Sequence, residues 1–330
     1  MDNLRIGILG AARIAPAALV KPARSVPEVT VAAVAARDPG KAAKFARKHG
    51  IPIAHSSYDA LLEDQSIDAI YNPLPNALHA PWTLRALEAG KHVLCEKPFT
   101  SNAAEAETVA AAARVSGRVV VEAFHYRYHP LAERMRAIAH DELGTVREVR
   151  TALCFPLPRF SDIRYNYALG GGALMDAGCY ALNCLRLLGP GEPEVVSAQA
   201  KLHTPQVDRA MSAELRFPGG ARGHIDASMW SRRLLGISAH VVGDRGELRV
   251  TNFVMPQMFN RLTVRVDGRK TSERVRGEPT YLGQLRAFAG AVLRGEPVPT
   301  TPEDAVVTMR LIDDIYRAAD MPVRGEPVKA

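Results

Sequence analysis

The sequence predicts an α/β fold, in which a parallel sheet is followed by an α+β domain with a large, mostly antiparallel sheet. Up to residue 122, short apolar strands alternate with helical segments, a spacing typical of parallel strands joined by right-handed crossovers. From residue 194 onward, alternating apolar and polar residues are interrupted by hairpin turns such as Pro218-Gly219-Gly220. We therefore expect two domains, 1–122 and 123–330.

Composition agrees with this division. A chain of 330 residues exceeds one typical hydrophobic core, and its 47% apolar and 23% charged residues are ordinary for soluble proteins. No apolar run reaches the roughly 18 residues of a membrane span, and the N-terminus has no signal-peptide pattern. The four cysteines show neither CxxC nor zinc spacing, so we expect reduced thiols and a cytoplasmic protein.

The net charge of +7 is spread along the chain, and no basic run resembles a nucleic-acid-binding arm. We therefore expect no nucleic acid and no membrane as partner. A distributed positive charge favours small anionic ligands, for example the phosphate of a cofactor.

The first element is a strand over residues 4–9, and the next residues open a helix. The run Gly10-Ala11-Ala12-Arg13-Ile14-Ala15 has the position of the dinucleotide fingerprint of a Rossmann fold, with Ala12 and Ala15 at its second and third glycines. Gly10 permits the tight turn, and small residues let the backbone approach a pyrophosphate at the helix N-terminus. We expect Gly10, Ala12, Arg13 and Ile14 to bind the cofactor.

The second strand, over residues 29–36, ends in Arg37-Asp38. An acid at this position binds a ribose 2′-hydroxyl, whereas an arginine suits a 2′-phosphate. Arg37, assisted by Lys41, therefore favours NADP over NAD. The alternative is that Asp38 caps the following helix and Arg37 only stacks on adenine.

The next strand, over residues 66–71, ends in Asn72-Pro73-Leu74-Pro75-Asn76, and a helix over residues 77–89 follows with His79 in its first turn. The apolar run 93–95 then ends in Glu96-Lys97-Pro98, where proline prevents further ladder pairing. Ligands of open α/β sheets bind at the carboxyl ends of the strands. We therefore assign further cofactor-binding roles to Asn72, Pro73, Asn76, His79, Glu96 and Lys97.

A lone lysine at this position is more often a solvated side chain. A helix over residues 101–116, with Ser101 as its N-cap, and a strand over residues 118–122 complete the first domain.

The second half begins with an aromatic and basic linker over residues 123–130, a helix over 131–140 and a strand over 146–155. His125 and His129 have the i, i+4 spacing of metal ligands. Because Pro130 disfavours helix at His129 and no third ligand is near, we predict no metal site.

Three glycines, 170–172, lead into a helix that ends at Gly189. Asp176 and Tyr180 are four residues apart and share one face of it. Gly178 lowers helix propensity but lets another element approach closely. The alternative is a buried tyrosine with a satisfied hydroxyl beside a solvated aspartate.

The remaining strands, at 194–203, 211–217, 221–229, 236–242, 247–251 and 262–266, predict an antiparallel sheet with amphipathic helices over 281–293 and 303–319. One face of such a sheet suits helices and the other a partner subunit, so we expect a homodimer or homotetramer.

The fingerprint, the Ala36-Arg37-Asp38 run, Cys95-Glu96-Lys97-Pro98 and the glycine-led Asp176-Ala177-Gly178-Cys179-Tyr180 resemble the Gfo/Idh/MocA family (glucose–fructose oxidoreductase and inositol dehydrogenase) over essentially the whole chain. Tyrosine at the last of these positions looks like the glucose–fructose oxidoreductase and dihydrodiol dehydrogenase branch. That resemblance implies an oxidoreductase that uses NADP and acts on a sugar, polyol or cyclic diol.

The resemblance also implies residue roles. Tyr180 would take the hydroxyl proton as hydride leaves the substrate, although an unperturbed phenol, with a pKa near 10, is a poor base at neutral pH. Lys97 would favour the phenolate and bind the substrate oxygen. Asp176 would orient the substrate or the lysine, and Glu96 the nicotinamide ribose. Arg127 and Arg164 are candidates for the substrate pocket.

Two other functions remain open at this point. A regulator of this fold would bind NAD(P) without catalysis, but it would have little need of both Lys97 and Tyr180. An NAD-dependent glycosidase of the same superfamily would oxidise its substrate only transiently. Accumulation of NADPH with an alcohol substrate would discriminate against both.

Overall fold

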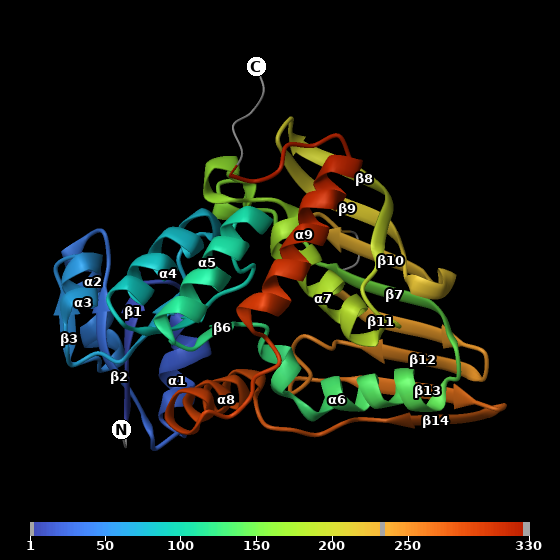
Figure 1. Ribbon diagram of the computed structural model, residues 1–330, viewed down its shortest axis with the longest axis horizontal. Coiled ribbons are helices and arrows are strands. Elements are labelled where there is room, and N and C mark those ends of the chain that lie inside the picture. Colours follow the sequence, from blue (N-terminus) through green and yellow to red (C-terminus); the bar gives the residue numbers. More distant parts are fainter. Residues whose placement is uncertain (1–2, 232–234, 326–330) are drawn as a thin grey trace. The chain divides into compact units, whose positions relative to one another are not determined.

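The computed structural model describes residues 3–231 and 235–325, and the chain divides into two compact units (Figure 1). The first unit contains Met1–Tyr128 and Tyr281–Val307, and the second contains His129–Thr280 and Thr308–Ala330. The division differs from the boundary expected at residues 122 and 123, because residues 281–307 belong with the N-terminal part of the chain.

The first unit is built on a six-stranded parallel sheet in the order β3-β2-β1-β4-β5-β6. Its strands are β1 (Leu4–Leu9), β2 (Val29–Ala35), β3 (Ile53–His55), β4 (Ala69–Asn72), β5 (His92–Cys95) and β6 (Val120–Glu122). The direction of strand succession reverses between β1 and β4, which is the topological switch point of a doubly wound sheet. The predicted parallel sheet is confirmed; β3 was missed.

Helices connect these strands. They are η1 (Pro16–Val20), α1 (Lys21–Ala23), α2 (Pro39–His49), α3 (Tyr58–Glu63), η2 (Asn76–Leu78), α4 (His79–Glu88), α5 (Ala103–Ser116), η3 (His125–Tyr128) and α8 (Thr280–Arg294). The predicted cap of α5 was wrong by one residue: Asn102, and not Ser101, accepts the Glu105 amide at 2.9 Å. The Ser101 amide instead donates to the Glu105 carboxylate, which completes a reciprocal cap.

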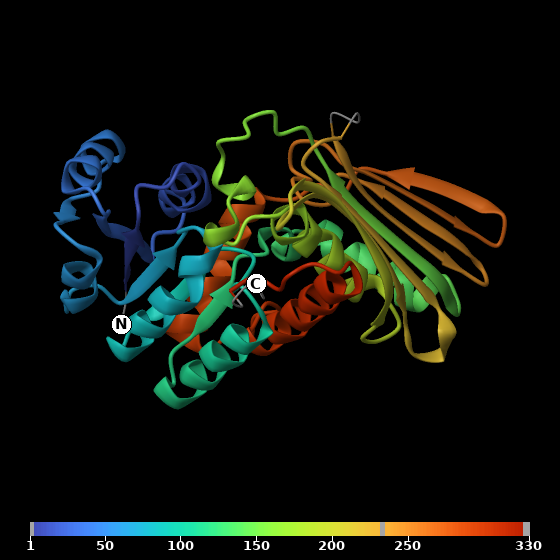
Figure 2. The ribbon, with the colours of Figure 1, turned by 90° about the horizontal axis from the view of Figure 1, so that it is seen from above.

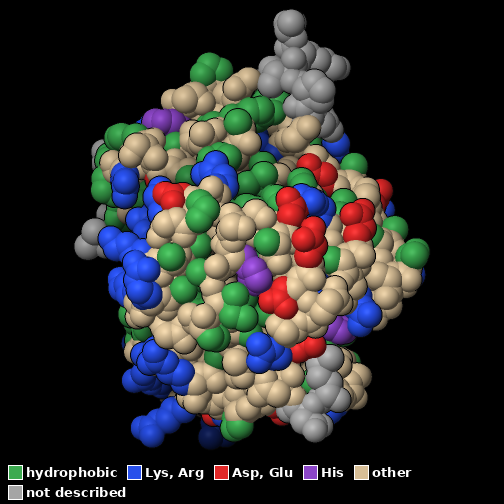
Figure 3. Space-filling view, turned by 90° about the vertical axis from the view of Figure 1, so that its left-hand side faces the viewer, with side chains coloured by type: hydrophobic (Ala, Val, Ile, Leu, Met, Phe, Trp, Pro, Cys, Tyr) green, Lys and Arg blue, Asp and Glu red, His purple; other side chains and the backbone are tan. Residues whose placement is uncertain are grey.

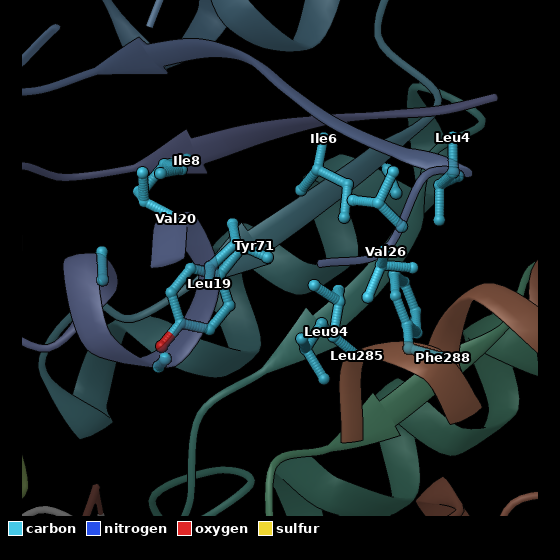
Figure 4. Packing of buried hydrophobic residues seen from close by; sticks show 14 of the residues in the cluster. Leu4, Ile6, Ile8, Leu19, Val20, Val26, Tyr71, Leu94, Leu285 and Phe288 are labelled. Carbon is cyan, nitrogen blue, oxygen red and sulfur yellow. The ribbon is translucent and has the colours of Figure 1, made fainter. Parts of the chain in front are cut away.

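The core of the first unit combines residues from both ends of the chain. Figure 4 shows Ile6 of β1 and Leu94 of β5 in one cluster with Leu285 and Phe288 of α8. All four side chains are fully buried. Since burial of each large apolar side chain is worth about 1.5–3 kcal/mol, α8 contributes to the stability of the N-terminal sheet.

The second unit is built on an eight-stranded sheet in the order β14-β13-β12-β11-β7-β10-β9-β8. Its strands are β7 (Val146–Cys154), β8 (Glu194–Thr204), β9 (Val207–Arg216), β10 (Arg222–Ser228), β11 (Gly236–Gly243), β12 (Gly246–Thr251), β13 (Arg261–Val266) and β14 (Arg269–Glu273). All neighbouring strands are antiparallel except β7 and β10, so the predicted, mostly antiparallel sheet is confirmed. The edge strand β14 was missed.

One face of this sheet carries helices (Figure 2). Besides α8, the helical elements after residue 128 are α6 (Pro130–Ala137), η4 (Ile138–Glu142), η5 (Ile163–Tyr165), η6 (Tyr167–Leu169), η7 (Leu174–Gly178), α7 (Cys179–Leu188), η8 (Pro218–Gly220) and α9 (Pro302–Ala318). Helix α7 packs on β7, β10 and β11. On β10, Gly223, Ile225 and Ala227 are buried toward this helical layer, whereas Arg222 and Asp226 are exposed on the opposite face.

Among the described residues, no helix is long and apolar enough to cross a membrane. The same residues contain no group of three histidine, cysteine, aspartate or glutamate side chains placed to hold a metal ion.

Two histidines of the first unit are almost completely buried, with exposed fractions of 1% for His79 and 2% for His125. The pKa of His79 is lowered to about 4 and that of His125 to about 3, mainly by burial, with the charge of Lys97 as a smaller cause in both. In the unfolded chain each would titrate near pH 6.5. Between these values the unfolded chain binds protons that the folded chain does not, so stability is lost as the pH falls.

We predict that His125→Phe, which keeps an aromatic ring beside Tyr281, flattens the pH dependence of stability. At pH 5 the slope of the unfolding free energy against pH should fall by close to one proton, about 1.4 kcal/mol per pH unit. Urea titrations between pH 4.5 and 6.5, roughly the window in which only the unfolded histidine is charged, measure this slope. The exposed His140→Gln variant is the control. Equal slopes in wild type and His125→Phe would contradict the prediction.

Candidate active site

The turn after β1 leaves no room for a side chain at Gly10. Its φ of +87° is in the left-handed region, and a Cβ there would lie 3.0 Å from Leu74 Cδ2. The Gly10 amide donates to the Ala35 carbonyl at 2.7 Å, which ties the turn to the end of β2. Ala12 is partly exposed beside this turn, and Arg13 and Ile14 are exposed. The conformation of this turn therefore depends on glycine at position 10, and the residues that follow it are accessible to solvent.

Arg37 is exposed at the end of β2, as predicted, and the neighbouring acid, Asp38, forms a hydrogen bond within the fold. Asp38 caps α2, because its Oδ1 accepts the Lys41 amide at 3.2 Å. The capping alternative for Asp38 is therefore confirmed, and the Arg37 side chain is exposed next to this cap.

Tyr58 adjoins this strand end and was missed by sequence analysis. Its hydroxyl is near Gly10 and accepts the Arg37 amide; burial raises the pKa of Tyr58, and the Arg37 charge opposes this. Its ring packs edge-on against Trp82 at 4.7 Å, and the Arg85 guanidinium lies 4.6 Å above the Trp82 ring. Tyr58 thus connects Arg37 with the Trp82 ring and, through that ring, with the Arg85 guanidinium.

The surface of the first unit has more cations nearby. Figure 3 shows lysine and arginine side chains gathered mainly along one side of this face. Helix α2, which follows Arg37 directly, exposes Lys41, Lys44, Arg47 and Lys48. The local field therefore favours an anion.

Asn72 and His79 hold the loop between β4 and α4. The Asn72 amide donates to the His79 carbonyl at 3.1 Å and to Thr83 Oγ1 at 3.2 Å, and its oxygen accepts the Leu74 amide. The His79 ring nitrogens lie 2.7 Å from the Pro98 and Leu74 carbonyls. A neutral ring can donate to only one of them; the carbonyls favour the charged ring, but burial dominates and lowers its pKa. Both side chains therefore bond within the fold and fix the shape of the loop.

The other two predicted residues of this loop differ in their exposure. Pro73 is buried, and Asn76 is partly exposed at the start of η2.

Glu96 and Lys97 follow β5, as predicted, and Lys97–Pro98 is a cis peptide bond. The Tyr71 hydroxyl donates to Glu96 Oε1 at 2.7 Å. Tyr281 is also near this carboxylate; burial raises the pKa of Tyr281, and the Glu96 charge raises it further. The His125 ring lies 4.2 Å from the Tyr281 ring. These tyrosines, both missed from sequence, therefore border the predicted carboxylate.

Lys97 is partly exposed and lies close enough to His79 and His125 to lower the pKa of each. The structure thus brings Glu96, Lys97 and His79 together at the carboxyl edge of the first sheet. Arg127 is also in the first unit and partly exposed, whereas Arg164, the other predicted substrate residue, is in the second.

In the second unit, Arg164 is fixed by two carboxylates. Its Nε lies 2.8 Å from Asp176 Oδ2, and its Nη1 lies 3.0 Å from Asp162 Oδ1. The charge of Asp176 is the largest cause that raises the pKa of Arg164, and burial opposes it. Asp176 therefore does not stand alone, as the alternative of a solvated aspartate supposed, but pairs with a predicted substrate residue.

Tyr180 is 6% exposed, one turn after Asp176. The helix that carries both begins as a π-helical turn, η7, before α7 starts at Cys179. A Cβ on Gly178 would lie 3.3 Å from Ala227 Cβ of β10, which confirms the expected close approach of another element. The wide π turn itself had no sequence signal, and such turns often occur at functional sites.

An aromatic cluster lies beside Arg164. The Phe160 ring packs against Tyr165, His203 and Trp230, with ring centroids 5.2–5.5 Å apart. Phe160 and Trp230 are about half exposed, whereas the Tyr165 hydroxyl donates to the Leu157 carbonyl inside the unit. The cluster therefore offers an accessible apolar surface in the second unit, which also contains Arg164.

Two family models match the chain. Residues 4–124 match the model described as "Oxidoreductase family, NAD-binding Rossmann fold", and residues 132–249 match the GFO/IDH/MocA C-terminal domain.

Similar proteins cover between two thirds and nearly all of this chain. D-xylose 1-dehydrogenase (NADP(+)) 2 of Haloferax volcanii is 38% identical over 318 residues, which are 96% of this chain and 98% of that protein. Mouse (Mus musculus) trans-1,2-dihydrobenzene-1,2-diol dehydrogenase is 37% identical over 234 residues, covering 69% of this chain and 68% of that protein.

The crystal structure of a 3-ketoreductase from Actinomadura kijaniata, in complex with NADP and TDP-benzene, aligns with a TM-score of 0.87 and 29% identity. The alignment covers 96% of this chain and 98% of that structure. The fingerprint turn, the Glu96-Lys97 strand end and these comparisons lead to one conclusion. The chain belongs to the GFO/IDH/MocA family and is an NAD(P)-dependent oxidoreductase.

Proposed function

We propose that the protein transfers a hydride between NADP and a secondary alcohol of a sugar, polyol or cyclic diol. The observation that carries the proposal is that each unit holds part of the proposed chemistry in a defined local setting. Lys97 stands at the carboxyl end of β5 beside Glu96, and Tyr180 stands one turn after the fixed Asp176.

The residues around Gly10 and Arg37 fit NADP. The Gly10 turn lets a pyrophosphate approach the backbone, and Arg37 provides a guanidinium for a 2′-phosphate. The neighbouring acid, Asp38, uses its Oδ1 to cap α2, and Arg37 is the cation at this strand end. The NADP-linked names of the Haloferax and Actinomadura proteins support the same cofactor. We place Ala12, Arg13, Ile14, Asn72, Pro73, Asn76, His79 and Glu96 around it.

When bound, NADP supplies the nicotinamide carbon that accepts or donates hydride. In the oxidation direction we assign Tyr180 as the base that takes the hydroxyl proton while the carbon–hydrogen bond breaks. Lys97 stabilises the phenolate by its charge and binds the substrate oxygen. Asp176, held by Arg164, orients the substrate, and Arg127 contacts it from the first unit.

The aromatic cluster of Phe160, Tyr165, His203 and Trp230 supports the proposed substrate class. The C–H face of a sugar or cyclic diol ring is apolar and packs on aromatic rings, while its hydroxyls bind charged groups such as Arg164. The names of the relatives, a xylose dehydrogenase and a dihydrodiol dehydrogenase, agree with such rings.

Purified protein incubated with NADP and a panel of sugars, inositols and cyclic diols, including D-xylose, tests the function. We expect NADPH absorbance to accumulate with one class of ring alcohol. If NADP binds but no alcohol or carbonyl substrate turns over, the non-catalytic regulator is correct. Hydrolysis of a glycoside without net NADPH would identify the glycosidase.

We predict that Arg37→Asp weakens NADP binding by about 10- to 100-fold and leaves NAD binding nearly unchanged. Loss of a charge-assisted contact to phosphate costs about 1.5–3 kcal/mol. Fluorescence titrations with both cofactors measure the effect. Arg47→Asp, an identical exchange of charge at an exposed position of α2, is the matched control. Equal losses for NADP and NAD would mean that Arg37 stacks on adenine only.

We predict that Tyr180→Phe lowers turnover by about two to four orders of magnitude, the usual contribution of general acid–base catalysis. NADP affinity should stay nearly unchanged, because the phenol acts on the substrate. Lys97→Ala should cost at least as much, and the double variant little more than the worse single one. Steady-state kinetics and the pH–rate profile, whose rising limb should report the coupled pair, measure this.

The control for the Tyr180 prediction is the stability of each variant, measured by thermal unfolding. A folded Tyr180→Phe enzyme that keeps more than about a tenth of wild-type turnover would rule out Tyr180 as the base. Lys97 would then be the remaining candidate.

We also propose that the face of the eight-stranded sheet opposite α7 pairs with a second copy of the chain. On this face histidines contact carboxylates, for example His224 with Glu214 at 2.8 Å and with Asp226 at 3.1 Å. His240 likewise pairs with Glu247 at 2.9 Å. A row that contains both basic and acidic side chains can pair with the same row on a copy related by a twofold axis.

We predict a dimer or a dimer of dimers in light scattering at micromolar concentration. His224→Glu places a third acid beside Glu214 and Asp226, and it should shift the population toward monomer through like-charge repulsion. The Arg47→Asp variant changes charge on the first unit and should leave the mass unchanged. A wild-type monomer under these conditions would contradict the proposal.

A further inference from the structure

A buried ion pair lies beneath the helix of Asp176 and Tyr180. Arg324 Nη2 is 2.9 Å from Asp208 Oδ1, and both side chains are completely buried. Buried charges lose their hydration, and an apolar replacement of similar size is often as stable or more so. The net effect of this pair on stability is therefore expected to be small, and its effect on structure depends on the groups that it holds in place.

Asp208 holds the first turn of the helix. Its Oδ2 accepts the amide of Leu174, the first residue of η7, at 2.7 Å. Amides in a first helical turn have no partner within the helix, so a carboxylate at this position both caps the helix and fixes its start. Asp176 and Tyr180 lie on the turns that follow.

Arg324 holds the loop before the helix. Its Nε donates to the Gly171 carbonyl at 2.7 Å while Nη2 binds Asp208. The next amide, of Gly172, donates to the Arg164 carbonyl at 2.9 Å. One guanidinium therefore connects the helix cap with the loop whose arginine pairs with Asp176.

Gly172 is required where the loop meets the ion pair. Its φ is +146°, and a Cβ there would lie 2.6 Å from the Tyr316 hydroxyl and 2.8 Å from Arg324 Nη2. The Tyr316 hydroxyl donates to Asp208 Oδ1 at 3.0 Å. No side chain other than hydrogen fits between the loop and this network, so the backbone is held at contact distance.

The C-terminal segment completes the arrangement. The Tyr167 hydroxyl donates to the Val323 carbonyl at 3.1 Å, and the Arg324 guanidinium lies 4.0 Å from the Tyr316 ring centre and 5.1 Å from that of Tyr167. Asp208 and Arg324 are 116 residues apart in the sequence. Distant segments of the chain thus meet at the start of this helix.

We propose that Arg324 and Asp208 are positioning residues for catalysis, which set the helix of Asp176 and Tyr180 through the Leu174 amide and the Gly171 carbonyl. The inference rests on the proposed roles of Asp176 and Tyr180. A displacement of about 1 Å in a reacting group can cost on the order of a hundredfold in rate, so a small change in the buried pair should reach the chemistry.

The main variant is Arg324→Lys. Lysine keeps the charge but lacks the rigid fork that reaches Gly171 and Asp208 together. We expect kcat to fall about 10- to 100-fold in enzyme that is folded at the assay temperature, with NADP affinity within about twofold of wild type. The matched control is Arg186→Lys, since Arg186 is also mostly buried in the second unit and pairs with Glu192 at 2.7 Å.

Amide hydrogen exchange gives a readout that does not depend on the reaction. Arg324→Lys should speed exchange at Leu174, whose amide Asp208 accepts, whereas Arg186→Lys should not. Arg324→Ala should regain turnover when guanidinium ion is added far below denaturing concentrations, and added sodium chloride should not restore it. A purely structural contribution would lower thermal stability in Arg324→Lys and Arg186→Lys alike without a selective loss of kcat.

If the arginine variants do not fold, Tyr316→Phe tests the same network by removing only the hydroxyl bound to Asp208. It should lower kcat a few-fold and speed exchange at Leu174. Wild-type kcat in either folded Arg324→Lys or folded Tyr316→Phe would overturn the inference. If Tyr180→Phe stays active while Arg324→Lys loses turnover, the positioning role holds through Asp176 on the same helix, and Lys97 is the remaining candidate for the base.

Discussion

Parallel pairing of β4, β5 and β6 is the constraint on which the first half of the site depends. Asn72 lies opposite Cys95 in the β4–β5 ladder, and Cys95 lies opposite Glu122 in the next one. Residues that follow these positions must therefore leave the sheet at one edge. The Asn72 loop and the Glu96-Lys97 segment become neighbours because this register brings the ends of β4 and β5 to the same edge of the sheet.

The second half of the site depends on buried and half-buried charge. Arg164 connects two carboxylates at the rim, and Arg324 connects a carboxylate with a backbone carbonyl in the interior. In both places a planar guanidinium with several donors joins a loop to the helix of Asp176. Loops without regular hydrogen bonding thereby acquire a defined position, which oriented chemistry requires.

The features of the fold that depend on residue periodicity and on local chemistry could be predicted from the sequence. The parallel strands, the antiparallel sheet and the close approach at Gly178 followed from residue spacing, and the Asp38 cap was the alternative that the sequence left open. Tyr58, Tyr71 and Tyr281 were missed, because only tertiary packing brings a lone tyrosine to a strand end. The Asp208–Arg324 pair had no signal either, since its members are 116 residues apart.

The return of α8 to the first unit has a consequence for how the protein is made. Leu285, Phe288 and Ala289 complete a core whose other buried members lie in the first 123 residues. During synthesis, the N-terminal sheet must therefore wait for His129–Thr280 of the second unit to emerge before its core can close. An N-terminal fragment would expose apolar strands. Because both units contain two separate stretches of the chain, no single cut releases two independent folding units.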